Sequence, residues 1–390
     1  MGANLLALRS HNTALVLDLL RTAGPDGISR LELAERTGLT PQAVSKITAR
    51  LRDSGLATEA GRRASTGGKP RTVLRLVPEA GHAVGVHLDR DELRVVLVDL
   101  TGTVVGERGA ALDLGAGSGV VVEAVGREVE ELVAGTVGRE GEELVAGTGV
   151  PEAAGSADGR SASAPLAVTG HLLGVGVALP GPLDHIHGVL HRVTGFPEWD
   201  GFPLRDALAR RLRVPVVVDK DTNAAALGLA VGGEGGAFAY LHLGTGLGAG
   251  LVIGGGVHRG ARTEAGEFGH QVIQLDGPPC DCGNRGCIEA LCLAAVARGD
   301  LDEAARVLGA GAANLVGLLD IDLVLLGGRT VAADPEPFVH GVAAVLGERA
   351  RREGAREAAV PVRVAPGGVR GVAEGAAQLL LGPLFGRADG

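Results

Sequence analysis

One histidine and three cysteines in the C-terminal half constrain this chain more than any other feature. His270 is followed by Cys280, Cys282 and Cys287, so that all four lie within eighteen residues. Three thiolates and one imidazole are the ligand set of a tetrahedral zinc site of the structural kind. We therefore expect one zinc ion held by these four side chains.

Carboxylates lie on both sides of the cluster. The run Glu264-Ala-Gly-Glu267-Phe-Gly precedes His270, and Glu289 follows two residues after the last ligand. Carboxylates and imidazole suit sugar hydroxyls, because each hydroxyl both donates and accepts a hydrogen bond. The pattern suggests a sugar pocket that a zinc site holds rigid.

Length and cysteine usage narrow the class of protein. A chain of 390 residues can bury at least two cores. No apolar run reaches the ~18 residues of a membrane span, and the first residues lack the basic and apolar segments of a signal peptide. All four cysteines lie between positions 280 and 292, whereas a disulfide framework would scatter them. We expect a cytoplasmic metal-binding protein.

Charge is divided unevenly along the chain. Residues 1–75 hold 12 Lys+Arg against 6 Asp+Glu, while the remaining residues hold 25 against 40. A small basic module joined to a large acidic one suggests that only the first touches nucleic acid.

The basic module has the pattern of a winged helix-turn-helix. Ser29 and Glu32 form a capping box, and Thr40 with Pro41 begins a third helix in which Val44, Ile47 and Leu51 face inward. Two strands then flank a basic loop at 64–71, which would be the wing. The candidate DNA contacts are Gln42, Ser45, Lys46 and Arg50 on the third helix and Arg62, Arg63, Lys69 and Arg71 on the wing. A three-helix protein-docking module with a solvated loop is the alternative.

A local duplication interrupts the larger module. Residues 126–136 recur almost unchanged at 138–148, and an Ala-, Ser- and Gly-rich stretch follows to residue 165. We interpret residues 126–165 as a flexible insertion, because two copies are too few for a solenoid.

The rest of the chain reads as strands, tight turns and helices with characteristic motifs. They include Pro180-Gly181-Pro182, Asp221-Thr-Asn223-Ala-Ala, the glycine-rich turn Gly244-Thr-Gly-Leu-Gly248, Ala265-Gly-Glu267-Phe-Gly-His270 and Cys280-x-Cys282-Gly-x-x-Gly-Cys287-x-Glu289. Together with the winged helix these segments resemble the ROK family of repressors, open reading frames and sugar kinases over nearly the whole chain. The resemblance implies an α/β fold: a winged helix-turn-helix over residues 1–78 and a two-lobed, actin-like domain of ribonuclease-H-like halves over 79–390.

The resemblance also assigns roles to individual residues. It implies structural zinc on His270, Cys280, Cys282 and Cys287. It implies sugar hydroxyls on Glu267, His270 and Glu289, with Asp221 as the catalytic base in kinase members. Cys292, five residues beyond the last ligand, is expected to pack in the core.

Two features argue against phosphoryl transfer. Family kinases carry a glycine-rich phosphate turn near the start of the domain, whereas the matching stretch here, residues 88–93, has no glycine and holds Asp91 and Glu92. We expect these carboxylates to repel ATP. The segment between Glu289 and the strand at residue 321 is also shorter than in family kinases. The sequence thus predicts a non-enzyme in which Asp221 is a vestigial base.

Lys220 is the one departure at the sugar site, where the family usually has Asn. It could donate to a sugar hydroxyl or to an acidic sugar, or it could pair with Asp219 or Asp221 and leave the pocket silent.

We expect a DNA-binding regulator of carbohydrate genes, most simply a repressor, that assembles as a homodimer or tetramer on an operator and responds to a sugar-type effector. The alternatives are an ATP-dependent sugar kinase with an appended DNA-binding domain, and a sugar-insensitive DNA-binding dimer.

Overall fold

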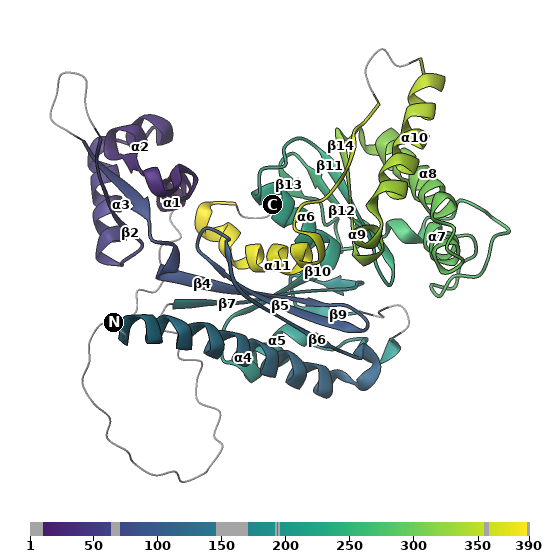
Figure 1. The fold of residues 1–390 in the computed structure, drawn as a ribbon, viewed down its shortest axis with the longest axis horizontal. Coiled ribbons are helices and arrows are strands. Elements are labelled where there is room, and N and C mark those ends of the chain that lie inside the picture. The colour runs from purple at the N-terminus through teal and green to yellow at the C-terminus, as the bar shows by residue number, and fades with distance from the viewer. Residues whose placement is uncertain are drawn as a thin grey trace, which may run out of the picture.

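The computed structural model describes residues 11–63, 71–145, 171–191, 193, 196–354 and 359–387. Figure 1 shows the winged-helix domain at one end, a first lobe beside it and a second lobe at the far end. No helix in these ranges is long and apolar enough to cross a lipid bilayer.

The N-terminal domain contains three helices and a three-stranded sheet. The helices are α1 (His11–Ala23), α2 (Arg30–Thr37) and α3 (Pro41–Asp53), and the strands β1 (Ile28–Ser29), β2 (Ala57–Arg63) and β3 (Arg71–Leu76) pair in the order β1-β3-β2. Both predicted caps are present: Ser29 and Glu32 form the capping box that begins α2, and Thr40 Oγ1 accepts from the N–H of Ala43 at the start of α3. The winged helix-turn-helix prediction is confirmed.

The first lobe is a five-stranded sheet with helices on both faces. Its strands β4 (Gly81–Leu88), β5 (Glu92–Asp99), β6 (Val104–Ala111), β7 (His171–Leu179) and β10 (Val216–Lys220) have the order β10-β7-β4-β5-β6. The helices α4 (Ser118–Val145) and α5 (Leu204–Leu212) enclose the core on one face, and α11 (Gly371–Leu381) packs on the other. A two-stranded ribbon, β8 (Leu183–Asp184) and β9 (Val189–Leu190), follows β7.

The interpretation of residues 126–165 as a flexible insertion is wrong for its first part. The first copy of the repeat lies inside α4, where Val129, Leu132 and Val133 are buried against the sheet. Glu128 pairs with Arg108 at 2.9 Å. The apolar residues of α4 recur with the helical period, as expected of a helix that buries one face. Residues 146–170 lie outside the described ranges.

The second lobe repeats the same architecture. Its sheet has the order β13-β12-β11-β14-β15, and its strands are β11 (Phe238–Leu243), β12 (Leu247–Ile253), β13 (Gly256–Val257), β14 (Leu323–Gly327) and β15 (Val362–Val364). The helices α7 (Ile288–Ala297), α8 (Leu301–Leu319) and α10 (Pro335–Arg352) bury one core with this sheet, and the short α9 (Arg329–Ala333) follows β14. The helix α6 (Asp221–Val231) packs on the opposite face. The predicted α/β fold with two similar lobes is confirmed.

The helix α11 lies between the parts of the molecule (Figure 1). A Cβ on Gly85 of β4 would stand 1.9 Å from Ala373 O, and one on Gly375 would stand 1.9 Å from Ala224 O in α6. Only glycine permits such backbone contact, so α11 is held tightly against the first lobe and against α6.

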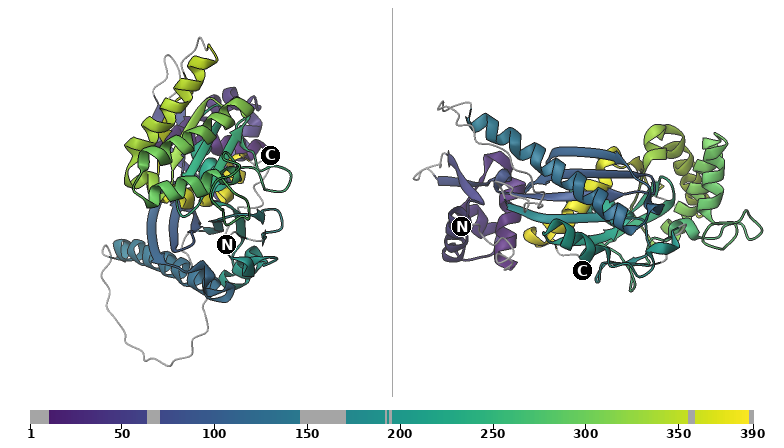
Figure 2. Two further views of the ribbon diagram at one scale, coloured as in Figure 1. Left: turned by 90° about the vertical axis from the view of Figure 1, so that its right-hand side faces the viewer. Right: turned by 90° about the horizontal axis from the view of Figure 1, so that it is seen from below.

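The turn that follows α11 packs against the DNA-binding domain. The turn Gly382–Phe385 packs against α1, and Leu17, Leu20, Leu381 and Phe385 belong to one core. Two views in Figure 2 show this domain seated against the first lobe rather than separated from it. The predicted domain boundary at residue 78 falls in the short connection between β3 and β4. Apolar residues from both sides of this boundary pack in one common core.

Candidate functional site

A polar cavity lies between the two lobes and encloses about 600 Å³, part of it open to solvent. The turns at the ends of β4, β7 and β11, the start of α6 and the segment before the cysteine cluster surround it. Every residue predicted to bind sugar lines this cavity: Lys220, Asp221, Glu267, His270 and Glu289. The structure therefore brings together side chains that are up to 69 positions apart in the sequence.

The four predicted metal ligands converge beside the cavity. One ligand atom from each of His270, Cys280, Cys282 and Cys287 lies within 4.8 Å of the others. The Sγ atoms of Cys282 and Cys287 are 3.7 Å apart, and Cys280 Sγ is 3.7 Å from His270 Nδ1. With Zn–S bonds of about 2.3 Å, the sulfur atoms of a tetrahedral site are roughly 3.8 Å apart, so the geometry fits zinc.

The donor set of the cluster, three thiols and one imidazole, also fits zinc. Burial, together with the neighbouring sulfurs, raises the pKa of the Cys287 thiol to about 12. A bound divalent cation reverses this preference and stabilises thiolates. Cys292 is fully buried among the apolar side chains of the second lobe and is not part of the cluster, which confirms its predicted packing role.

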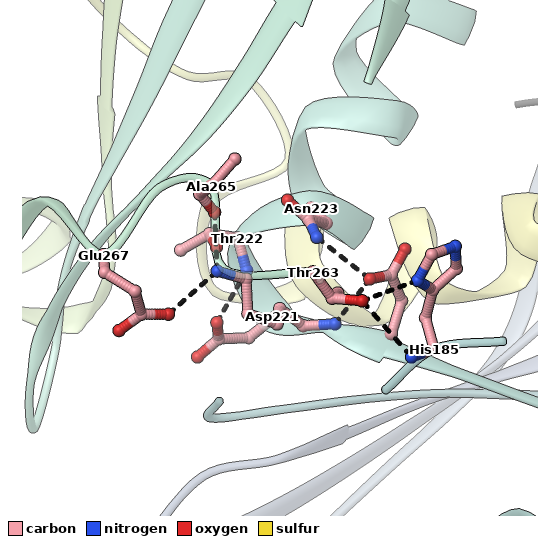
Figure 3. A network of polar contacts seen from close by, with 9 residues as sticks. His185, Asp221, Thr222, Asn223, Thr263, Ala265 and Glu267 are labelled. Atoms are coloured by element: carbon pink, nitrogen blue, oxygen red, sulfur yellow. Dashed lines mark hydrogen bonds and ion pairs between the residues drawn. The ribbon is translucent and has the colours of Figure 1, made fainter. Parts of the chain in front are cut away.

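Lys220 forms an internal ion pair, although with neither of the two expected partners. Its ammonium is almost fully buried and donates to Glu267 Oε1 at 2.9 Å and to the carbonyl of Ala265 at 2.6 Å (Figure 3). The methylene stem lies on Gly181, where Lys220 Cδ is 2.7 Å from the position of a Cβ. Lys220 thereby ties the end of β10 to the segment that carries Glu267.

Asp219, which precedes Lys220 in the chain, forms a buried network of its own next to the site. Its carboxylate accepts from the side-chain amide of Asn223 at 3.0 Å and from Arg259 Nε at 2.7 Å. Asp219 and Arg259 are both buried. This pair could not be predicted from the sequence, because Arg259 stands in an irregular segment forty residues away.

Asp221 begins α6 and faces the cavity. Its Oδ1 accepts from the N–H of Thr222 at 2.6 Å (Figure 3). Burial raises the pKa of Asp221 above its usual value, although His242 and this hydrogen bond oppose the shift. A carboxyl group of this kind can accept from or donate to a hydroxyl.

Glu289 is buried at the first turn of α7. Its Oε2 accepts from the N–H of Leu247 at 2.8 Å, which joins the cysteine-rich segment to the glycine turn of β11 and β12. The carboxylate is therefore oriented before any ligand arrives.

Asp91 and Glu92, which we expected to repel a phosphate, are each paired with an arginine. Asp91 accepts from Arg329 of the second lobe at 2.9 Å, and Glu92 pairs with Arg94 on its own strand. Neither carboxylate is among the side chains that line the cleft cavity. Arg90, between Asp89 and Asp91, does line it.

Asp89 forms a second connection between the lobes. Its Oδ1 accepts from Thr245 Oγ1 at 2.6 Å and from the N–H of Arg90 at 2.7 Å. Burial raises the pKa of Asp89, but the two hydrogen bonds outweigh burial, so this pKa lies below its usual value. Asp89 and Thr245 were not predicted as parts of the sugar site, because their proximity exists only in the folded arrangement of the two lobes.

The predicted DNA-binding residues divide into two groups. On α3, Gln42, Ser45 and Lys46 are exposed on the side opposite the core. Arg50 is exposed too, but its Nη2 donates to Thr13 Oγ1 of α1 at 2.8 Å. Arg71 is exposed at the start of β3. Lys69 and the side chains of Arg62 and Arg63 lie outside what the structure describes.

Two families match the chain. Residues 163–298 match the ROK family, and residues 24–58 match a family described as winged helix-turn-helix DNA-binding.

Several known proteins are similar to the chain. The xylose repressor of Caldicellulosiruptor bescii is 29% identical over 67% of this chain and 59% of its own length. The regulator NagC of Escherichia coli is 29% identical over 74% of this chain and 64% of its own. This chain thus spans somewhat under two thirds of the length of each.

Among solved structures, a ROK family transcriptional regulator, described as a homologue of the Escherichia coli MLC protein, covers 96% of this chain and 97% of its own. It has a TM-score of 0.69 and 20% identity. A ROK hexokinase from Thermus thermophilus covers 76% of this chain and 96% of its own, with a TM-score of 0.54 and 27% identity. The regulator aligns with nearly the entire chain, whereas the hexokinase leaves almost a quarter of it unmatched.

Proposed function

Since this chain belongs to the ROK family and begins with a winged helix-turn-helix domain, we propose that it is a repressor of carbohydrate genes. In this proposal a sugar bound between the lobes sets its affinity for operator DNA. The observation that carries the proposal is the shared core of the two modules, in which α11 and the turn after it pack on both the first lobe and α1. The protein would act in the cytoplasm, where its operator lies.

The exposed face of α3 supports DNA binding. Gln42, Ser45 and Lys46 present short polar and cationic groups at the N-terminal end of a helix, as the recognition helix of a helix-turn-helix protein does in the major groove. Lys46 and Arg71 would contact phosphates, which fix register without reading sequence. Arg50 already donates one hydrogen bond from α3 to Thr13 of α1. It can contact a phosphate only with the N–H groups that this bond does not use.

The cleft cavity supports a sugar effector. Asp221, His270 and Glu289 offer directional acceptors and donors around one volume, and Glu289 is already oriented by a backbone bond. His270 would hold zinc through Nδ1, which leaves Nε2 on the opposite side of the ring for a hydroxyl. Glu267 and Lys220 would complete the sugar site. Lys220 holds one carboxylate oxygen of Glu267 in place, and the other oxygen would accept from a sugar hydroxyl.

Zinc would act as a structural support here. When bound, it fixes the segment that carries His270 relative to the start of α7, where Glu289 stands. No chemical step depends on it.

A mechanical path links the cavity to the DNA-binding domain. Asp221 begins α6, α6 touches α11 backbone to backbone at Gly375, and α11 leads to the turn that packs on α1. A sugar that favours one lobe arrangement would shift the position of α1, and with it the spacing of recognition helices in a dimer. A homodimer or tetramer would supply the second helix for a two-fold operator.

A second candidate, an ATP-dependent sugar kinase, is favoured by the glycine turn at 244–248 and by the carboxyl of Asp221 in the same cavity. A third candidate is a dimer that binds DNA and ignores sugars.

Fluorescence anisotropy with DNA from upstream of the gene tests the proposal, with wild type and Lys46→Ala compared at about 0.15 M salt. We expect specific binding that one sugar of a panel alters and that Lys46→Ala weakens. Release of ADP with any sugar would favour the kinase instead. Specific DNA binding that no sugar affects would favour the insensitive dimer.

A further inference from the structure

Arg90 is the feature of the cleft that the proposed function leaves unexplained. It occupies the turn between β4 and β5 and lines the cavity, facing the glycine turn between β11 and β12. Its guanidinium carbon is 5.9 Å from the ring centroid of Phe196. In the described part of the chain, no oxygen forms a hydrogen bond or ion pair with this guanidinium.

The acidic neighbours of Arg90 are all engaged elsewhere. Asp91 is paired with Arg329, Glu92 with Arg94, and Asp89 is bonded to Thr245. The turn therefore directs one free positive charge into the cavity, although its composition is acidic.

Lys220 is not a second unpaired positive charge in the cavity. Its ammonium is committed to Glu267 and to the carbonyl of Ala265, at 2.9 and 2.6 Å. Of the lysine and arginine side chains that line the cavity, Arg90 alone is unpaired among the described residues.

The surroundings of Arg90 suit an anionic group on a ligand that also carries hydroxyls. A Cβ on Gly246 would stand 3.7 Å from Arg90 Nη2 and 3.0 Å from Glu289 Oε2, so the guanidinium and a hydroxyl-binding carboxylate flank the same point. The N–H groups of Thr245 and Gly246 have no acceptor within the described ranges. A guanidinium beside free backbone N–H groups binds carboxylate or phosphate strongly and with defined geometry.

From these contacts, and resting on the proposed function, we infer that the effector is an anionic sugar with one carboxylate or phosphate group. Its acidic group lies on Arg90, and its hydroxyls lie on Asp221 and Glu289. A neutral sugar would fill the cleft without giving this guanidinium a hydrogen-bonded acidic partner, although carboxylates stand elsewhere in the lining, and this disfavours a neutral ligand.

Isothermal titration calorimetry tests this inference on the zinc-loaded full chain. The probes are glucose, xylose, glucuronate, glucose 6-phosphate and the ATP analogue AMPPNP. The proteins are wild type, Arg90→Met, and the control Arg306→Met, which removes an exposed arginine of α8 that pairs with Glu303.

We expect an anionic sugar to bind wild type at least about tenfold more tightly than its neutral parent. Arg90→Met should weaken that binding by about 10- to 100-fold, because a charge-assisted bond is lost, while Arg306→Met should leave it unchanged. The affinity for neutral sugars should change by less than about threefold in both variants.

Three results would overturn the inference: equal affinity for anionic and neutral sugars, unchanged affinity of Arg90→Met, or binding of AMPPNP alone. The last would assign Arg90 to a nucleotide. Operator binding measured in parallel separates this failure from that of the proposed function. If a neutral sugar alters operator binding, only the anionic class is wrong, whereas absence of operator binding by wild type would refute the proposed function itself.

Discussion

Removing Glu267 should destabilise the protein more than removing Lys220, although Glu267 is the more exposed partner of the pair. The exposed side-chain fractions are 39% for Glu267 and 3% for Lys220. Glu267→Ala leaves a buried ammonium whose remaining acceptor is the carbonyl of Ala265, and we expect a loss of roughly 3 kcal/mol.

Lys220→Met removes the buried charge instead. The methionine keeps an unbranched stem over Gly181, and Glu267 regains water. The unpaired carbonyl of Ala265 costs about 1–2 kcal/mol, part of which is offset because no ammonium has to be desolvated. We therefore expect a net loss of about 1 kcal/mol. The double variant should be no less stable than Lys220→Met, so the two changes are strongly non-additive.

Equilibrium urea unfolding provides the assay, followed by circular dichroism and by the fluorescence of Trp199. This single tryptophan is buried in the core of the first lobe, the lobe that contains Lys220, and it donates to Leu114 O at 3.0 Å. The urea concentration at the midpoint of unfolding should fall most for Glu267→Ala, and the dependence of the unfolding free energy on urea concentration should stay unchanged. A larger loss for Lys220→Met, or additive losses in the double variant, would refute the reasoning.

Three further predictions concern zinc, pH and DNA. Cys282→Ser should reduce zinc from about one ion per chain to a small fraction and weaken sugar binding at least about tenfold; full metal content by mass spectrometry would contradict this. Burial and the neighbouring His242 lower the pKa of His87 to about 3. Between pH 7 and pH 5 this histidine therefore takes up a proton in the unfolded chain but not in the folded one, and the free energy of unfolding should fall by about 2 kcal/mol. Thermal unfolding of His87→Phe should show no such fall. Lys46→Ala should lower the salt slope of DNA binding by about 0.9 at constant thermal stability, whereas Arg50→Ala should lower thermal stability as well, because its bond to Thr13 is lost.

Patterns that are local in the sequence predicted the structure well. The caps of α2 and α3, the strands around the wing and the convergence of His270 with three cysteines follow from spacing and side-chain chemistry over short distances. The prediction for the first part of residues 126–165 is wrong because the repeat suggests an insertion, whereas the apolar residues recur with the period of a helix that buries one face.

Contacts between segments far apart in the sequence could not be predicted from such local patterns. Lys220 pairs with Glu267 rather than with an adjacent aspartate, because β10 ends facing the segment before the zinc ligands. Asp91, in the acidic turn after β4, pairs with Arg329, 238 residues further along the chain. Only the folded arrangement of the lobes decides which cationic side chain of the cavity is left unpaired, and among the described residues this is Arg90.

The most direct test of the account measures sugar affinity by calorimetry, once for the free protein and once for the protein saturated with operator DNA. If the sugar acts through α6 and α11 on the DNA-binding domain, the operator must change sugar affinity by the same factor as the sugar changes operator affinity. We predict a change of about fivefold or more, equal in the two directions. Equal sugar affinity with and without operator would contradict the account, since the cleft and the DNA-binding domain would then be uncoupled.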